Sequence, residues 1–203
     1  MNRRIQKELI EPSVRGTLNV MRSCVKAGTV RRVFLTSSVA AVFVRPVSLQ
    51  GDGHVLDEDS WSDVEHLRAE KPPLWWAYCV SKVLLEKAAC RFAEEHGISL
   101  VTVCPVTTIG AAPSLNFNTS VPSSLSLLSG DEVWLGVLKL TERTAGSVPL
   151  CHVDDLCRAE LFVAEAPAAA GRYICCGLNT TIAELARFLA RKYPQYDVMR
   201  NLQ

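Results

Sequence analysis

The sequence lacks the features that mark several broad classes of protein. No apolar run approaches the length of a membrane span, and the basic residues at the start have no apolar stretch behind them, unlike a secretory signal. The formal net charge is only +1, which gives no reason to expect binding to nucleic acid or to a membrane surface. With 48% apolar and 21% charged residues among 203, the composition is that of an ordinary globular chain.

The eight cysteines lack the spacing of a zinc site or a disulfide framework. No two of them form a C-x-x-C pair, and the four histidines show no metal-ligand spacing with them. Several lie in apolar runs such as Ile174-Cys175-Cys176, where cysteine acts as a small hydrophobic residue. We therefore expect reduced thiols, no bound metal and a cytoplasmic protein.

A third absence concerns phosphate binding. Dinucleotide-binding sheets begin with a strand that runs into a G-x-x-G-x-x-G turn, where backbone N–H groups meet a pyrophosphate. The 203 residues contain no such turn: Gly51 and Gly53 are isolated in a polar segment, and Gly171 and Gly177 lie late in the chain. The chain also starts on a predicted helix rather than on a strand.

The elements that are present alternate between helix and strand. The first half predicts a helix over 4–27, which ends at Gly28 and which Pro12 either kinks or starts, followed by a buried strand over 32–38. A long irregular connection over 44–73 comes next. It is followed by a helix over 76–95 that ends at His96-Gly97 and by a strand over 98–105. The second half predicts helical patches at 122–129 and 131–140, a strand at 147–152, a helix capped by Asp154 or Asp155, a strand at 171–176, and a last helix opened by the capping box Thr181-x-x-Glu184. This order is typical of an α/β fold with a parallel sheet.

Chemistry is indicated by a tyrosine, a lysine and a serine. Tyr78 and Lys82 are four residues apart on a predicted helix and so share a face. A nearby ammonium favours the phenolate, so we expect the pKa of Tyr78 to lie below its usual value of about 10. Such a tyrosine can give a proton to a carbonyl oxygen while hydride arrives at carbon, and Ser38 at the end of the preceding strand can hold the same oxygen. The ordinary alternatives are a surface contact for the pair and a strand-end turn for Thr36-Ser37-Ser38.

Longer stretches of sequence make the pattern specific. They lie at 16–21, 33–38, 57–63, 78–82 and 152–159. With these segments the chain, from about residue 8 to 197, resembles the plant dihydroflavonol reductase, anthocyanidin reductase and cinnamoyl-CoA reductase group of extended short-chain dehydrogenases/reductases. The resemblance implies an NADP-dependent oxidoreductase of flavonoid biosynthesis with a small phenolic substrate.

Within this group the sequence looks most similar to anthocyanidin reductases, at Lys71-Pro72-Pro73 and at 121–124 and 171–176. Phe43 stands where dihydroflavonol reductases typically carry Asn or Asp, which argues against a dihydroflavonol substrate. The N-W-Y-C-x-x-K pattern of cinnamoyl-CoA reductases is half met, because 75–79 supply the Cys but not the Asn.

The resemblance also assigns residues to the site. The catalytic set would be Ser38, Tyr78 and Lys82. The NADPH-binding set would be Tyr78, Lys82, Pro105, Val106, Thr107, Thr108 and Ser124. For His152 and Asp154 we favour a strand-end residue and a helix cap over a catalytic role.

Family members carry a further portion before the position of Met1, including the glycine-rich turn, and another at the far C-terminus. The resemblance therefore implies an incomplete Rossmann-like sheet in a single domain over 1–203, with 111–147 as a substrate-region insertion. We expect weak NADPH binding by this chain alone. We also expect the strand at 33–37 to form an exposed edge prone to association. Three functions stay open: an anthocyanidin reductase-like enzyme, a cinnamoyl-CoA-type carbonyl reductase, or a truncated product without enzymatic activity.

Overall fold

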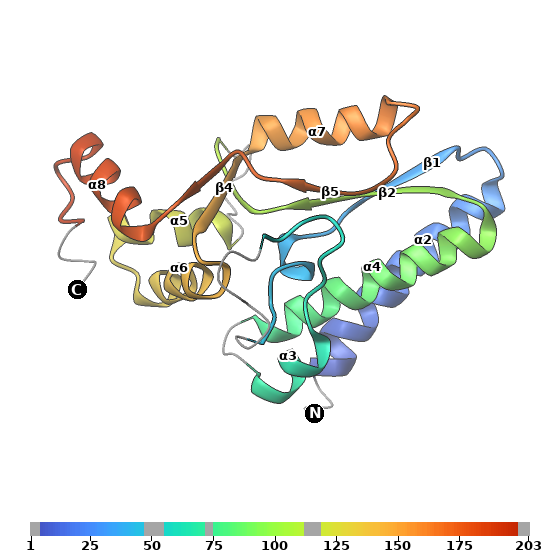
Figure 1. The fold of residues 1–203 in the computed structure, drawn as a ribbon, viewed down its shortest axis with the longest axis horizontal. Helices are drawn as coiled ribbons and strands as arrows, with labels where there is room; N and C mark the ends of the chain where they lie inside the picture. Colours follow the sequence, from blue (N-terminus) through green and yellow to red (C-terminus); the bar gives the residue numbers. More distant parts are fainter. Residues whose placement is uncertain (1–4, 47–54, 72–74, 112–118, 199–203) are drawn as a thin grey trace. The chain divides into compact units, whose positions relative to one another are not determined.

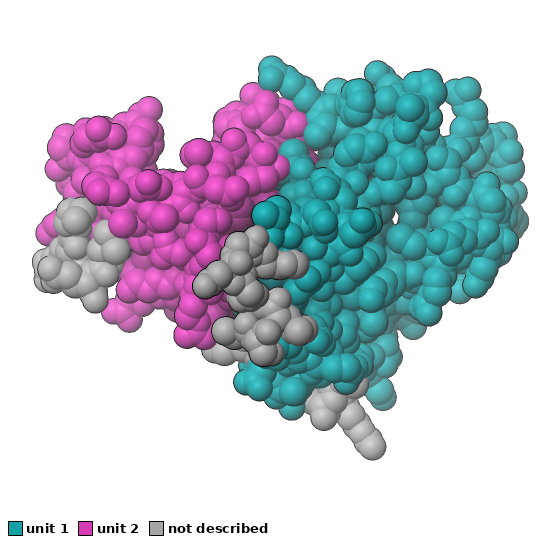
Figure 2. Space-filling model, viewed as in Figure 1, with its two compact units in different colours: residues 1–105, 158–175 teal, residues 106–157, 176–203 magenta. Residues whose placement is uncertain are grey.

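A computed structural model describes residues 5–46, 55–71, 75–111 and 119–198. The chain divides into two compact units (Figure 2). Unit 1 contains Met1–Pro105 and Arg158–Cys175, and unit 2 contains Val106–Cys157 and Cys176–Gln203.

Unit 1 is built on a three-stranded parallel sheet. Its strands are β1 (Arg32–Thr36), β2 (Ser99–Pro105) and β5 (Gly171–Cys175), in the order β1-β2-β5. The central strand β2 is the most buried, since it is paired on both sides and covered on both faces. The predicted parallel α/β sheet is thus confirmed.

Helices cover both faces of this sheet (Figure 1). The helices α2 (Glu11–Ala27) and α4 (Trp76–His96) lie on one face, where Met21 and Phe92 pack with Leu35 and Leu100. On the other face lies the part of α7 (Val153–Glu165) that belongs to unit 1. Parallel strands need such cover because their backbone and apolar side chains are buried from both sides.

The ends of the first two long helices follow from local sequence. Gly28 and Gly97 take the left-handed conformation that ends α2 and α4, with φ of 66° and 64°. Pro12 lies in the first turn of α2, where its missing N–H costs no hydrogen bond, so it starts this helix. A π-helical turn over Gln6–Ile10 precedes it.

The described part of unit 2 has a mixed sheet, three complete helices and the first turn of α7. Its strands β3 (Thr107–Ile109) and β4 (Val148–His152) are parallel, and β6 (Leu178–Thr180) is antiparallel to β4. The helices are α5 (Ser120–Ser129), α6 (Glu132–Ala145) and α8 (Ile182–Lys192). Their apolar faces share one core with the sheet, built on Leu127, Leu138, Val148, Leu150, Ala186 and Leu189. The predicted region 111–147 falls in this unit, and its assignment as a substrate region stays a prediction.

Two details of the predicted secondary structure were wrong. The segment 44–73 is not irregular throughout, because Asp63 accepts a hydrogen bond from the N–H of His66 and starts the short helix α3 (Val64–Glu70). Asp154 and Asp155 do not cap α7, which begins at Val153. They lie in its first turn, where a carboxylate favours the positive end of the helix dipole.

Other predictions differ in extent or fall outside the described residues. Both β3 and β6 have three residues, which is too short for a periodic pattern, and neither was predicted. Gly51, Gly53, Pro72 and Pro73 lie outside the described residues. The capping box of α8 is confirmed, with Thr181 and Glu184 each bonding the other's backbone N–H.

The described part of the chain contains no helix that is both long and apolar enough to cross a bilayer. None of the eight cysteines, all of which lie among the described residues, forms a disulfide bond. Burial raises the pKa of Cys79 to about 12 and that of Cys104 to about 11, which keeps both thiols protonated at neutral pH. No group of three or more His, Cys, Asp or Glu side chains suited to a metal ion occurs among the described residues.

Candidate active site

The candidate site begins where β1 ends. After Thr36 the backbone N–H of Ser37 still donates to Val103 O of β2, at 2.8 Å. Ser38 then turns the chain into a short 3-10 helix, Val39–Ala41, and its hydroxyl accepts from the N–H of Ala40 at 3.2 Å. The predicted strand-end turn is therefore present, and it places the Ser38 side chain at the carboxyl end of a parallel sheet, where α/β folds bind ligands.

Two of the predicted residues come from the N-terminal half of α4. Tyr78 and Lys82 are one turn apart, and Lys82 Nζ lies 5.5 Å from the centroid of the Tyr78 ring. Lys82 Nζ also donates to the carbonyl oxygen of Ser37 at 3.3 Å. All three predicted catalytic side chains, with Ser38 as a hydrogen-bond partner of Tyr78, thus gather in unit 1.

The expected lowering of the Tyr78 pKa is wrong for this structure. The Tyr78 side chain is 42% exposed as a whole, yet the protein around its hydroxyl raises its pKa above the usual value. Ser38 acts in the opposite direction as a hydrogen-bond partner, and the Lys82 ammonium does not contribute. The same desolvation lowers the pKa of Lys82. Desolvation disfavours the charged form of either group, and it is the largest cause of both shifts.

The remaining predicted residues are divided between the units. Pro105 ends β2 in unit 1 and pairs with Cys175 of β5. The other four belong to unit 2. Val106 directly precedes β3, Thr107 and Thr108 lie on β3, and Ser124 lies on α5. The roles of all five toward a cofactor stay predictions. His152 ends β4, as predicted, and it is His152 rather than Asp154 that bonds the start of α7, because its Nδ1 accepts from the backbone N–H of Asp154 at 3.2 Å.

The sequence analysis did not identify three polar residues that form a hydrogen-bond network next to this site. They are Ser37, Glu86 and Arg172, and Glu86 contacts both of the others at 2.6 Å. A signal was available for one of them, because Glu86 lies four residues after Lys82 on the face that carries Tyr78. No comparable signal marks Arg172, since only the fold brings β5 to α4.

Comparison with known proteins agrees with this arrangement. Residues 2–177 match the NAD dependent epimerase/dehydratase family. The chain belongs to this family. The resemblance to extended short-chain dehydrogenases/reductases is thereby confirmed, and so is the dependence of the family on a nicotinamide cofactor.

Individual relatives of this family are similar over nearly the whole chain. An anthocyanidin reductase of Vitis vinifera is 46% identical over 193 residues, which are 95% of this chain and 56% of the relative. A dihydroflavonol 4-reductase of Zea mays is 42% identical over 95% of this chain and 51% of the relative. The chain therefore spans about half the length of the curated relatives it matches.

Solved structures in the family share the fold. Vestitone reductase from alfalfa superimposes with a TM-score of 0.76 and 33% identity, over 94% of this chain and 57% of that one. The yeast methylglyoxal/isovaleraldehyde reductase Gre2 complexed with NADPH gives a TM-score of 0.72 at 25% identity, over 96% of this chain and 58% of that one. These matches confirm the Rossmann-like α/β architecture.

Proposed function

We propose that this chain carries the proton-transfer site of an NADPH-dependent reductase that acts on flavonoid-type substrates, in the manner of an anthocyanidin reductase. One observation carries the proposal: Ser38, Tyr78 and Lys82 gather at the end of β1 and on the first turns of α4. Identity to anthocyanidin reductases over 95% of the chain supports the substrate class.

Tyr78 would be the proton donor. Because burial raises its pKa, the phenol stays protonated at neutral pH and has a proton to give. Its partial exposure leaves the hydroxyl accessible to a substrate oxygen, and the Ser38 hydroxyl beside it can bond the same oxygen. These two hydroxyls would orient the substrate and stabilise charge on its oxygen during reduction.

Lys82 fits the cofactor. An ammonium has three N–H donors, and in this structure Lys82 donates to the Ser37 carbonyl, which leaves further donors for the hydroxyls of a ribose. When bound, NADPH supplies the hydride. The resemblance adds Pro105, Val106, Thr107, Thr108 and Ser124 as residues near the nicotinamide end.

The substrate pocket would be aromatic near Phe43. This side chain is buried, 3% exposed, and packs on Trp75 with ring centroids 5.1 Å apart. An apolar ring here gives no hydrogen bond to a substrate hydroxyl, unlike the Asn or Asp of dihydroflavonol reductases. This difference favours an anthocyanidin over a dihydroflavonol.

The test is a reduction assay on two proteins. One is the 203-residue chain, and the other is a chimera in which this chain replaces the aligned segment of the Vitis vinifera anthocyanidin reductase. We expect the chimera to reduce cyanidin with NADPH. Tyr78→Phe should lower the rate by about 10²–10⁴-fold, because it removes the proton but keeps the ring.

The alternatives give different outcomes. Reduction of feruloyl-CoA rather than cyanidin would assign the chain to the cinnamoyl-CoA-type reductases. A folded chimera that reduces neither compound would contradict the proposal and support a chain without enzymatic activity. An unchanged rate in Tyr78→Phe would show that another group gives the proton.

A further inference from the structure

The buried carboxylate of Glu86 has no part in the chemistry described so far. Among the described residues it is the charged side chain that is fully buried, with 0% exposure. It lies on α4 four residues after Lys82 and eight after Tyr78, so the three side chains follow one face of the helix. Burying a carboxylate is costly unless it is hydrogen-bonded or paired with a cation, so Glu86 needs specific partners on this helix face.

Glu86 has two strong hydrogen bonds. Its Oε2 accepts from the hydroxyl of Ser37 at 2.6 Å, and its Oε1 accepts from Nε of Arg172 at 2.6 Å. Both distances are typical of charge-assisted bonds, in which the carboxylate is ionised. The carboxylate therefore connects the end of β1 with β5.

Arg172 extends the same network on the side away from Ser37. Its Nη1 donates to the carbonyl oxygens of Glu58 and Ser60, at 2.8 and 2.7 Å, and its guanidinium lies 3.8 Å from the centroid of the Trp61 ring. Its side chain is only 9% exposed. The guanidinium thus holds one oxygen of Glu86 and is itself held by these contacts, while the other oxygen accepts from Ser37.

Ser37 is the point where Glu86 and Lys82 meet. Its hydroxyl bonds Glu86, its carbonyl accepts from Lys82 Nζ, and its N–H donates to Val103. Three bonds to two elements, α4 and β2, leave this residue little freedom. Ser38, the proposed substrate ligand, is the next residue along the chain.

We propose that Glu86 is a positioning residue of this site, which acts through Ser37 to fix the Lys82 ammonium and the Ser38 turn, and whose negative charge favours the charged form of the half-buried Lys82. The inference rests on the proposed function in one respect, the role of Lys82 toward the cofactor. A buried ion pair is not in general a gain in stability over well-packed apolar residues, so a role in placing charge accounts better for its presence here.

The groups that face Lys82 agree with this assignment. Burial lowers the pKa of Lys82, while Cys104 of β2 and Glu86 raise it. The Cys104 thiol, with a pKa of about 11, is uncharged at neutral pH, and the Tyr78 phenol is uncharged as well. Glu86 is therefore the group whose negative charge acts on Lys82 at neutral pH.

The experiment follows the titration of Lys82 in the 203-residue chain. Lysines are reductively methylated with ¹³C, the Lys82 signal is assigned by its loss in Lys82→Arg, and its shift is recorded against pH. We expect Glu86→Gln to lower the pKa of Lys82, so that the fraction deprotonated at pH 8 rises at least ~3-fold. Glu95→Gln removes the same charge from an exposed position on α4 and should leave the Lys82 titration unchanged.

A second variant covers the case in which Glu86→Gln does not fold. Glu86→Gln with Arg172→Leu removes the buried pair as a unit, a change that proteins often tolerate. Circular dichroism establishes its fold, and a smaller lowering of the Lys82 pKa is expected, because the positive charge of Arg172 is removed together with the negative charge of Glu86. An unchanged Lys82 titration in either folded Glu86 variant would overturn the proposal. If Lys82 responds to Glu86 while the reductase assay fails, the coupling stands and the proposed function is wrong.

Discussion

At the scale of single residues, burial has more influence on protonation than neighbouring charges. Tyr78 and Lys82 lie close together, yet desolvation moves both pKa values toward the neutral forms. The two buried thiols next to this pair, Cys79 and Cys104, follow the same rule. The site therefore contains a protonated phenol and a lysine whose charged form is favoured by Glu86.

The buried thiol of Cys79 predicts a loss of stability at alkaline pH. Its folded pKa of about 12 lies above the usual thiol value, so the unfolded chain releases its proton first as the pH rises. The contribution of Cys79 is complete below the unfolded pKa and should fall by about 1.4 kcal/mol per pH unit between the unfolded and folded values.

Urea unfolding of wild type and Cys79→Val at pH 7, 9 and 10 checks this prediction. The comparison is needed because Cys104 and Tyr78 act in the same direction as Cys79, whereas Lys82, whose folded pKa is lowered, acts in the opposite one. The free energy of unfolding should depend less on pH in Cys79→Val. An identical pH dependence in the two proteins would contradict the assignment.

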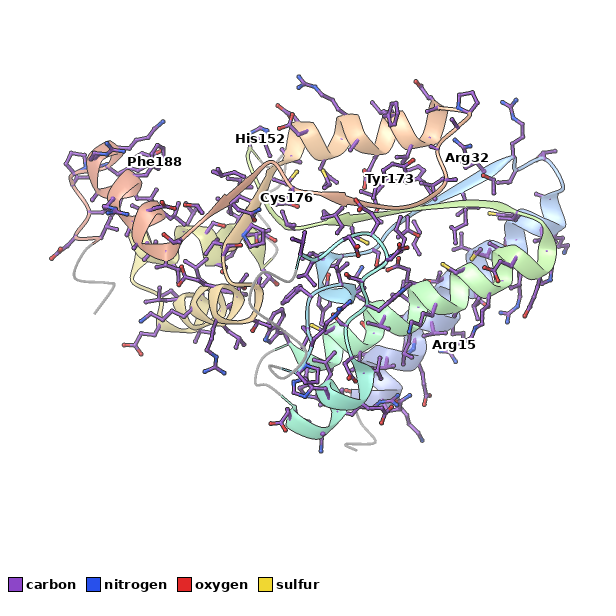
Figure 3. All side chains as sticks on the ribbon, in the orientation of Figure 1. Arg15, Arg32, His152, Tyr173, Cys176 and Phe188 are labelled. Atoms are coloured by element: carbon purple, nitrogen blue, oxygen red, sulfur yellow. The ribbon has the colours of Figure 1, made fainter. Side chains whose placement is uncertain are left out.

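At the scale of elements, one arginine joins β1 to the end of α7. Arg32 donates through Nη1 to the carbonyl oxygens of Val163 and Ala166, at 3.0 and 2.5 Å, and through Nη2 to that of Pro167 at 3.1 Å. The last carbonyls of a helix have no partner within it, and a cation also favours the negative end of its dipole. Arg32 thus satisfies the end of a helix on the other side of the sheet from α4 (Figure 3).

Arg32→Met is expected to lower the free energy of unfolding by about 1–3 kcal/mol, because it leaves these partly buried carbonyls without their donor. Arg15→Met is the control, since Arg15 lies on the exposed surface of α2. Urea unfolding measures both. Equal effects of the two substitutions would show that the bonds to α7 add nothing to stability.

At the scale of the whole molecule, the chain contains the three proposed catalytic residues but no glycine-rich turn. In dinucleotide-binding sheets that turn meets the pyrophosphate, so most contacts to the cofactor depend on it. We expect the 203-residue chain to bind NADPH weakly. Isothermal titration measures this, and micromolar affinity would contradict the expectation.

The edge of the sheet in unit 1 gives a second prediction at this scale. Among the described strands β1 pairs with β2 alone, and Phe34 on β1 is 45% exposed. An apolar edge strand favours pairing with another chain. Sedimentation velocity should show association that rises with concentration, and Phe34→Lys should reduce it. A wild-type chain that stays monomeric at high concentration would rule this association out.

The sequence by itself determined most of the local structure and predicted the residues of the candidate site. Gly28, Gly97, Pro12 and the box Thr181-x-x-Glu184 set helix ends through backbone geometry and short-range bonds, which need no tertiary context. Spacing placed Tyr78 and Lys82 on one face in the same way. The short strands β3 and β6 escaped prediction because strands of three residues depend on their neighbours.

Only the tertiary structure decided how charges are distributed around this site. The pKa of Tyr78 depends on how much protein surrounds its side chain, and the spacing of residues in the sequence does not reveal this burial. Glu86 and Arg172 are 86 residues apart and meet because β5 comes to lie beside β2. The sequence thus names the candidate reactive groups, and the fold decides which of them are charged, because burial and long-range contacts arise only when distant segments pack together.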